Sequence, residues 1–464
     1  FGHTDNAEVK NLTVSGKISG STCTGGIIGL AWATSIVNCK NLCDIEDVDL
    51  FSTSGGIVGI ADKGSSVTKC KNYGNIFGGS YAGGICGKFV VGELRDTNEN
   101  YGQIRASVAV GGICGEIRNT VNLEGAVLIN HEEASLDSSE ALYVGGIFGQ
   151  CDFYAYIPIG ERELEVHGTF INKANVKNSK VESGLGGIFG KIILRKENIK
   201  YNFLAKCENY GNITSSGHSS SVGGIVGIID NFESSIVLSN SSNYGKISGE
   251  ADKLMRIGGI CGILIGENII TNCHNSGDII LSDTNNILNF SSVGGICGQI
   301  SKIDRIENVG LISKCTNTGN IYLLSKYGYC GGICGQIWKG GKITNCYSGG
   351  LCYLPDKFPV NELFVGGICG QNTKGTITSC ISTFNPLNKT INNTHLGGIV
   401  GQTDEKAILH CYYDKQLCPI DEVSGYGVAK FTRELVGLSP KLEGISADDW
   451  IFAENLYPRL NFRA

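Results

Sequence analysis

The sequence predicts an all-β chain that folds as a parallel β-helix, or β-solenoid, of about 12–13 rungs with a small C-terminal cap. Three observations lead to this prediction. A box of the form Gly-Gly-Ile-x-Gly recurs along most of the chain. A second box, Cys-x-Asn-x-Gly in many of its copies, lies between successive copies of the first. The composition, 67 Gly and 7 Pro in 464 residues, is typical of many tight turns between short strands.

The glycine box sets the length of one repeat. Its spacing is 28 to 41 residues, and the shortest repeats suit one coil of a β-helix, so we expect one rung per repeat. We expect a right-handed coil, because left-handed hexapeptide coils are shorter and more regular. The tail of a thirteenth copy is visible in Phe1-Gly2, and we expect the array to be truncated at its N-terminal edge. The twelve complete copies start at Gly25, Gly55, Gly83, Gly111, Gly145, Gly186, Gly223, Gly258, Gly294, Gly331, Gly366 and Gly397.

The second box predicts strands on either side of a turn. Asn-x-Gly indicates a turn, because Asn and Gly tolerate a positive φ. The residues around it alternate between apolar and polar, as in 342–346, which is the period of a strand. Each repeat is therefore expected to hold three short strands with Gly or Asn corners. No segment shows a sustained helical period with caps, so helical repeats are not expected.

The fourth position of the glycine box predicts an inward-facing column. Cys alternates there with Val, Ile and Phe, so the site is apolar. Residues stacked on neighbouring rungs lie ~4.8 Å apart, which is long for the ~3.8 Å between the Cβ atoms of a disulfide. We therefore interpret these cysteines as reduced core residues. They are Cys86, Cys114, Cys261, Cys297, Cys334 and Cys369.

Fourteen further cysteines are divided between a second column and isolated positions. The column cysteines are interpreted as small buried residues in the same way. Disulfides stay open as an alternative only for the isolated ones. The second column comprises Cys39, Cys70, Cys207, Cys273, Cys315, Cys346, Cys380 and Cys411, and the isolated residues are Cys23, Cys43, Cys151, Cys330, Cys352 and Cys418.

These motifs resemble the GLUG-motif repeats of bacterial surface proteins. The best-matching segment is 331–347, GGICGQIWKGGKITNCY, and the resemblance extends over essentially the whole chain. It implies a solenoid array over residues 1–411, a capping segment over 412–464, and further domains of the same polypeptide before the array. It also implies an extracellular or cell-surface location.

Composition and motifs argue against several classes of function. The net charge of −6 offers no basic footprint for nucleic acid, and no apolar run is long enough for a membrane span. Cys330 and Cys334 lack a second pair at zinc-finger spacing, and the histidines are scattered, so we expect no metal site. The glycine box occurs too often to be a nucleotide-binding turn. We therefore expect no cofactor and no catalytic residue.

The function predicted is a structural or adhesive surface module, a rigid scaffold or stalk for an unidentified protein or carbohydrate ligand. A glycan surface is predicted at Phe153, Tyr154 and Tyr156, whose rings could instead cover the edge of the core. One alternative is a filament-forming subunit that stacks end to end. The other is a β-helix carbohydrate-active enzyme, a lyase or hydrolase, whose candidate residues are Asp152, Glu161, Arg162, Glu163, Glu165, Asp230 and Glu233.

Overall fold

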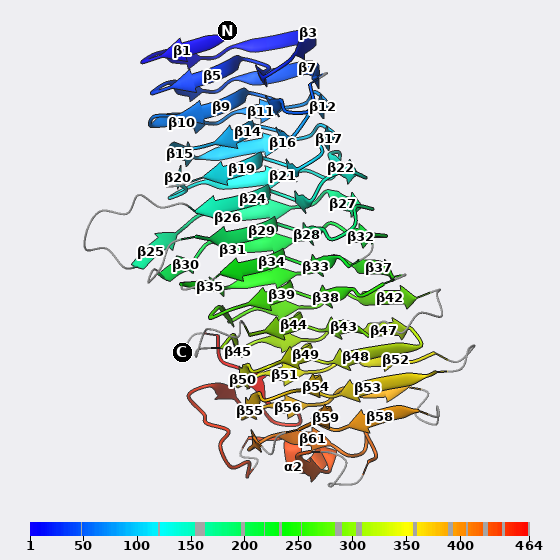
Figure 1. Ribbon diagram of the computed structural model, residues 1–464. Coiled ribbons are helices and arrows are strands. Elements are labelled where there is room, and N and C mark those ends of the chain that lie inside the picture. The colour runs from blue at the N-terminus through cyan, green and yellow to red at the C-terminus, as the bar shows by residue number, and fades with distance from the viewer. Residues whose placement is uncertain are drawn as a thin grey trace. The chain divides into compact units, whose positions relative to one another are not determined.

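The computed structural model describes residues 1–47, 49–118, 121–153, 163–195, 200–217, 219–231, 234–251, 253–283, 290–302, 309–355, 360–387, 393–404, 407–420, 426–438 and 441–462. The chain divides into two compact units. The first comprises Phe1–Ser220 and Gly224–Ile236, and the second comprises Ser221–Gly223 and Val237–Ala464. Within each unit, strands of successive repeats lie side by side in parallel (Figure 1).

Parallel strands confirm the predicted β-solenoid. The strand that follows the glycine box, here called the post-box strand, pairs in parallel with its counterpart in the next repeat, so each repeat is one rung. In the first unit these strands are β1 (His3–Asp5), β5 (Ile28–Trp32), β9 (Val58–Asp62), β14 (Cys86–Phe89), β19 (Cys114–Arg118), β24 (Phe148–Phe153), β29 (Phe189–Leu194) and β34 (Val226–Asn231). In the second unit they are β39 (Cys261–Ile265), β44 (Cys297–Ser301), β49 (Cys334–Trp338), β54 (Cys369–Asn372) and β59 (Val400–Thr403).

The described post-box strands number thirteen, which matches the twelve complete boxes and the partial one at Phe1-Gly2. The carbonyl groups of Phe1 and Gly2 accept hydrogen bonds from the N–H groups of Gly29 and Leu30, at 2.8 and 3.0 Å. His3 then pairs with Leu30. The first two residues thus occupy the place of the last two residues of a glycine box, as the sequence predicted.

Pre-box strands carry the first glycine of each box in register. Gly25 pairs with Gly55, and Gly83 pairs with Gly111. The pre-box strands of the first unit are β4 (Cys23–Gly25), β8 (Thr53–Gly55), β13 (Tyr81–Gly83), β18 (Ala109–Gly111), β23 (Tyr143–Gly145) and β28 (Gly184–Gly186). Those of the second are β33 (Ser221–Gly223), β38 (Arg256–Gly258), β43 (Ser291–Gly294), β48 (Tyr327–Gly331), β53 (Glu362–Gly366) and β58 (Thr394–Gly397).

Each rung contains more strand segments than the three expected from the sequence. The repeat that begins at β13 continues through β14, β15 (Gly92–Arg95), β16 (Thr97–Asn100) and β17 (Ile104–Arg105). The prediction of three strands was wrong because each box bends the chain. The alternation of apolar and polar residues continues through the bend, so two strands were predicted as one. The glycine box separates β13 from β14, and Asn-x-Gly separates β16 from β17.

The asparagine of the second box forms a buried column, here called the Asn ladder. In the first unit each Nδ2 donates to the Oδ1 of the next asparagine, at 2.7 to 3.0 Å, through Asn41, Asn72, Asn100, Asn130, Asn172 and Asn209. In the second unit the same bonds join Asn243, Asn275 and Asn317. Most of these amides also donate to the carbonyl group two residues later, as Asn72 does to Gly74 at 2.8 Å.

The positive φ expected at Asn-x-Gly lies elsewhere in the second box. It falls on the residue before the cysteine, as at Lys69, Lys314 and Asn345, whose φ values are 56°, 49° and 50°. Gly74 is needed for a different reason, because a Cβ there would lie 1.8 Å from the Cys43 carbonyl oxygen. The box therefore places one asparagine in the core beside a glycine on which the preceding rung packs.

Strands on either side of the Asn-x-Gly bend form another part of each rung. In the first unit they are β3 (Thr13–Gly20), β7 (Lys40–Asp47), β11 (Lys71–Asn72), β12 (Ile76–Phe77), β21 (Val127–Asn130), β22 (Ser135–Ser138), β26 (Thr169–Asn172), β27 (Asn175–Asn178), β31 (Lys206–Asn209) and β32 (Ile213–Ser215). In the second they are β36 (Ser241–Asn243), β37 (Ile247–Ala251), β41 (His274–Asn275), β42 (Ile279–Asp283), β46 (Thr316–Asn317), β47 (Ile321–Leu324), β51 (Tyr347–Ser348), β52 (Leu351–Tyr353), β56 (Ile381–Ser382), β57 (Asn385–Leu387) and β61 (Tyr412–Asp414).

The tail after Cys411 packs against the last rungs of the second unit. Strand β62 (Val428–Lys430) pairs in parallel with β61 and so adds one more strand to the stack. The short helix α2 (Thr432–Leu435) and the antiparallel pair β63 (Trp450–Ile451) and β64 (Arg459–Leu460) follow. Leu435, Trp450 and Leu460 are buried in one cluster with Ile381 and Tyr412, so the tail also covers the outer side of β56 and β61.

Candidate functional site

A groove in the first unit results from unequal repeat lengths. The corner between the second-box strands and the next pre-box strand contains three residues in two neighbouring rungs, at 78–80 and 106–108. The corners of the flanking rungs hold at least four described residues, at 49–52 and 139–142. A hollow of about 570 Å³ is lined by both short corners and by residues of the two longer ones. We call it the corner groove.

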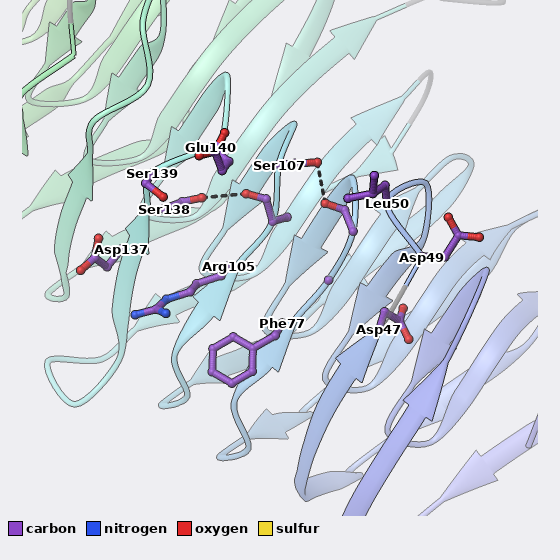
Figure 2. Close-up of a pocket in the computed structure, with 13 residues that line it drawn as sticks. Asp47, Asp49, Leu50, Phe77, Arg105, Ser107, Asp137, Ser138, Ser139 and Glu140 are labelled. Atoms are coloured by element: carbon purple, nitrogen blue, oxygen red, sulfur yellow. Dashed lines mark hydrogen bonds between the residues drawn. The ribbon is translucent and has the colours of Figure 1, made fainter.

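Small residues form the floor of the corner groove, and serine hydroxyl groups bind its backbone. The floor comprises Gly78, Gly79, Ala106 and Ser107. The hydroxyl of Ser107 donates to the Gly79 carbonyl, and that of Ser138 donates to the Ala106 carbonyl, each at 2.7 Å (Figure 2). These bonds satisfy backbone carbonyls at the corner and hold adjacent rungs together.

The walls of the corner groove are mainly acidic. Asp47, Asp49, Asp137 and Glu140 line it with one cation, Arg105, for a formal charge of −3. Asp47 is held in place by the hydroxyl groups of Thr24 at 2.7 Å and Ser54 at 2.5 Å. The guanidinium carbon of Arg105 lies 5.7 Å from the centre of the Phe77 ring and so occupies one face of it. Figure 2 shows Phe77, Arg105 and Asp137 on successive strands.

An apolar projection adjoins the acidic wall. Leu50 lines the groove and is 73% exposed, and Phe51 beside it is 86% exposed. Asp49 accepts a hydrogen bond from the Phe51 N–H group at 2.9 Å, which fixes this corner. The groove thus offers carboxylates and exposed apolar side chains to a ligand. Within the described part of the chain, no group of three potential metal ligands is found.

The six predicted core cysteines lie inside the rungs. All six side chains are fully buried. Four of them stack in the second unit, where Cys297 pairs with Cys261 and Cys334, and Cys334 with Cys369. Their thiols donate to the carbonyl group two residues later, as Cys114 does to Glu116 at 3.1 Å. Burial raises the pKa of the Cys297 thiol, which disfavours the reactive thiolate.

Two of the isolated cysteines meet in the core of the second unit. The sulfur atoms of Cys330 and Cys352 lie 3.7 Å apart, and both side chains are fully buried. All twenty cysteines are free thiols in this structure.

Of the predicted glycan surface, Tyr154 and Tyr156 lie outside the described residues. Phe153 is 6% exposed. Its ring stacks on that of Tyr201, with centroids 4.8 Å apart, and lies 6.0 Å from that of Phe203. It also lines a hollow of about 460 Å³ with Leu164 and Tyr201. The buried ring faces of Phe153 leave little surface on which a sugar could stack.

The acidic residues considered for catalysis lie against basic side chains wherever they are described. Asp152 pairs with Arg195 at 3.0 Å, and Asp230 pairs with Lys191 at 2.9 Å. On the outside of the first unit, Glu163 pairs with Lys200 and Glu165 with His167. Glu161, Arg162 and Glu233 lie outside the described residues.

A row of charges on the post-box strands was not predicted from the sequence. Lys88 and Glu116 are paired across β14 and β19, and their side chains join at 2.8 Å. Arg118 binds the same carboxylate at 3.0 Å. The signal that could have revealed this row is the polar residue that directly follows the box in successive repeats, from Lys88 to Lys191.

A second polar cluster surrounds Glu99 on β16. Its carboxylate accepts a hydrogen bond from the Tyr101 hydroxyl group and lies 3.1 Å from Lys71 Nζ and 3.2 Å from His131 Nε2. The ring of Tyr101 stacks between those of Tyr73 and His131. Burial raises the pKa of Glu99, but the bonds from Tyr101 and Lys71 outweigh it, and the pKa is lowered.

We predict that Glu99→Gln destabilises the first unit at neutral pH and has no effect in acid. Because the folded-state pKa lies below the unfolded value near 4.3, the carboxylate stabilises the fold above that pH, and the contribution disappears as the pH falls through the folded-state pKa. Urea titrations from pH 7 to pH 3 should show a difference of up to about 1 kcal/mol that closes on acidification. The matched control is Glu8→Gln, on an exposed carboxylate. A difference that stays constant as the pH falls from 7 to 3 would contradict the assignment.

No family model, curated protein or solved structure matches this chain. The resemblance to GLUG repeats is therefore carried by the motifs alone. No helix in the described residues is long and apolar enough to cross a membrane.

Proposed function

We propose that this chain is a non-catalytic adhesive module of a bacterial surface, a rigid scaffold that presents the corner groove to a ligand. The observation that carries the proposal is the position of the groove on the Asn ladder. Asn72, Asn100 and Asn130 lie in the same rungs as Phe77, Arg105 and Asp137. A buried chain of hydrogen bonds thus fixes the spacing of the groove walls before any ligand arrives.

Preorganisation of this kind favours binding. A site whose walls are already ordered loses little conformational entropy when a ligand is held. The same rigidity suits a module that bears load between a surface and its target. The surface location rests on the resemblance to GLUG repeats, and the binding role rests on the groove.

The enzymatic alternative finds less support. Carboxylates and cations do adjoin on the post-box strands, as a polysaccharide lyase would require. However, Glu116 and Asp152 are buried and already paired with Lys88, Arg118 and Arg195. Side chains committed to such pairs serve the packing of the rungs, because removal of either partner leaves a buried charge uncompensated.

The binding test probes arrays of glycans and of extracellular-matrix proteins with the full chain. The activity test incubates the chain with polysaccharides that contain the same glycans and measures new reducing ends and unsaturated products. We expect retention of a ligand without cleavage. Cleavage that depends on Glu116 or Asp152 would overturn the proposal in favour of the enzyme. Labelling of the chain inside intact cells alone would overturn the surface role.

A further inference from the structure

We propose that the corner groove binds an extended basic peptide segment of a partner protein, with its cationic side chains against the acidic wall and its apolar side chains against Leu50 and Phe51. This inference rests on the proposed binding role and names the class of ligand. It is drawn from the charge, the exposed apolar surface and the dimensions of the groove.

Charge complementarity is the first argument. Four carboxylates and one guanidinium line the hollow, so a cationic ligand gains electrostatic energy there and an anionic one loses it. Glu140 pairs with Lys180 at 3.3 Å, and its side chain is 69% exposed, so an incoming cation can still reach this carboxylate. The wall is built from separate rungs, so its carboxylates are spread along the stacking direction of the strands.

The apolar projection is the second argument. Leu50 and Phe51 are among the most exposed large apolar side chains in the first unit, and they stand on the same corner as Asp49. Exposed apolar groups beside charges are typical of protein-binding surfaces. A peptide that alternates cationic and apolar residues would satisfy both features.

The dimensions are the third argument. The groove crosses four rungs, which at strand spacing is a length of ~14 Å. An extended peptide advances ~3.3 Å per residue, so four or five residues fill it. Its volume of about 570 Å³ is in the range of small ligand sites.

A neutral glycan fits the groove less well. Sugar rings bind by stacking on an open aromatic face, and Phe77 is the aromatic residue that lines the groove. Arg105 lies over one face of that ring. Apart from Leu50, the remaining lining groups are charged or small, which suits a cation better than an uncharged ring.

The experiment measures binding of a labelled peptide, acetyl-Lys-Leu-Lys-Leu-Lys-amide, to the full chain by fluorescence anisotropy. We expect saturable binding that weakens as NaCl rises from about 50 to 300 mM, because the wall is open to solvent. The acidic counterpart, acetyl-Glu-Leu-Glu-Leu-Glu-amide, is expected not to bind. A peptide of equal charge without leucine, acetyl-Lys-Ser-Lys-Ser-Lys-amide, separates charge from apolar contact and should bind at least about threefold more weakly.

Paired variants locate the site. We expect Asp137→Asn with Glu140→Gln to weaken binding at least about fivefold, and Leu50→Ser with Phe51→Ser to weaken it similarly. The control, Asp5→Asn with Glu124→Gln, removes the same two charges from exposed positions outside the groove and should change binding by less than about twofold. All of these side chains lie at the surface, and circular dichroism confirms that each variant is folded.

The outcomes separate this inference from the proposed function. Equal losses in the groove and control pairs, or equal binding of the acidic peptide, would overturn the inference. If glycans or matrix proteins are retained on the arrays and the groove variants retain them equally, the groove assignment is wrong and the adhesive role stands. If the arrays retain only a neutral oligosaccharide that Asp137→Asn with Glu140→Gln leaves unaffected, the peptide is the wrong class. If nothing binds in either assay, both proposals are wrong.

Discussion

Replacement of Asn130 by alanine is expected to destabilise the first unit by about 3–5 kcal/mol. Asn130 Oδ1 accepts from Asn100 Nδ2 at 2.8 Å, and its own Nδ2 donates to Asn172 Oδ1 at 3.0 Å. All three side chains are fully buried. Alanine leaves a donor on Asn100 and an acceptor on Asn172 without partners and without access to water. Each buried orphan costs about 1–3 kcal/mol, and the lost packing adds to this.

The measurement is urea unfolding combined with amide hydrogen exchange, because a repeat array can open locally rather than as a whole. Exchange should accelerate first in β16, β21 and β26, whose rungs the three asparagines join. The control is Lys173→Ala, which truncates the exposed side chain next to Asn172. Unfolding midpoints that coincide for Asn130→Ala and wild type would show that the ladder does not stabilise the stack.

A second substitution at this position separates hydrogen bonding from side-chain volume. Asn130→Asp keeps the shape and the acceptor for Asn100 but loses the donor to Asn172 whenever the carboxyl group is ionised. Because burial raises the folded-state pKa of such a carboxyl group, its cost should decrease as the pH falls through that pKa and the group becomes a donor again. Urea midpoints for Asn130→Asp should therefore approach the wild-type value in mild acid, while those for Asn130→Ala should not.

The rung could be predicted from the sequence because each rung corresponds to one copy of the sequence repeat. Gly25 and Gly55, or Cys86 and Cys114, occupy the same place in successive copies, and stacking copies in register is what a parallel solenoid does. Interchange of Cys, Val, Ile and Phe at the fourth box position likewise marked an inward site. Both inferences follow from a comparison of the repeats with one another.

The corner groove could not be predicted in that way. It depends on the difference in length between neighbouring corners, and its signal is the pair of shortest box spacings, from Gly55 to Gly83 and from Gly83 to Gly111. The longest insertion, near Phe153, was expected to hold a site, because insertions often carry function. In a solenoid a short repeat between longer ones creates a concavity as effectively as an insertion creates a projection.

The Asn ladder was missed for a different reason. The asparagine of Asn-x-Gly has two structural roles open to it, a turn residue with positive φ or a buried amide. Local propensity favours the first. Asn72 and Asn100 are buried amides because the side chain of Asn72 donates to that of Asn100 one rung away. Only the stacked structure provides this contact.

Replacement of Gly112 by alanine is expected to cost about 3 kcal/mol or more, although the change adds only one methyl group. A Cβ at this position would lie 2.1 Å from the Gly146 carbonyl oxygen and 2.5 Å from the Asn130 side-chain carbon. The first of these atoms belongs to the backbone of the next rung and cannot move without separating the strands. The second belongs to the Asn ladder. The prediction is tested by urea unfolding and by exchange of the amides of β18 and β23.

Substitutions at two other glycines separate the cost of the steric clash from the cost of backbone strain. A Cβ at Gly2 would have no other atom within 4 Å, so Gly2→Ala should change stability by less than about 0.5 kcal/mol. Gly125 also faces open space but has a φ of 72°, so Gly125→Ala should cost about 1 kcal/mol through backbone strain alone. If all three substitutions cost the same, close approach of the rungs is not the reason for the glycine box.

The double variant Gly112→Ala with Asn130→Ala joins the two predictions. Removal of the asparagine side chain relieves the contact with the new methyl group but leaves the clash with the Gly146 carbonyl. The cost of the pair should therefore be smaller than the sum of the single costs and larger than that of Asn130→Ala alone, a coupling expected of groups in direct contact. Strict additivity would mean that the second glycine of the box is required by the neighbouring backbone and not by the Asn ladder.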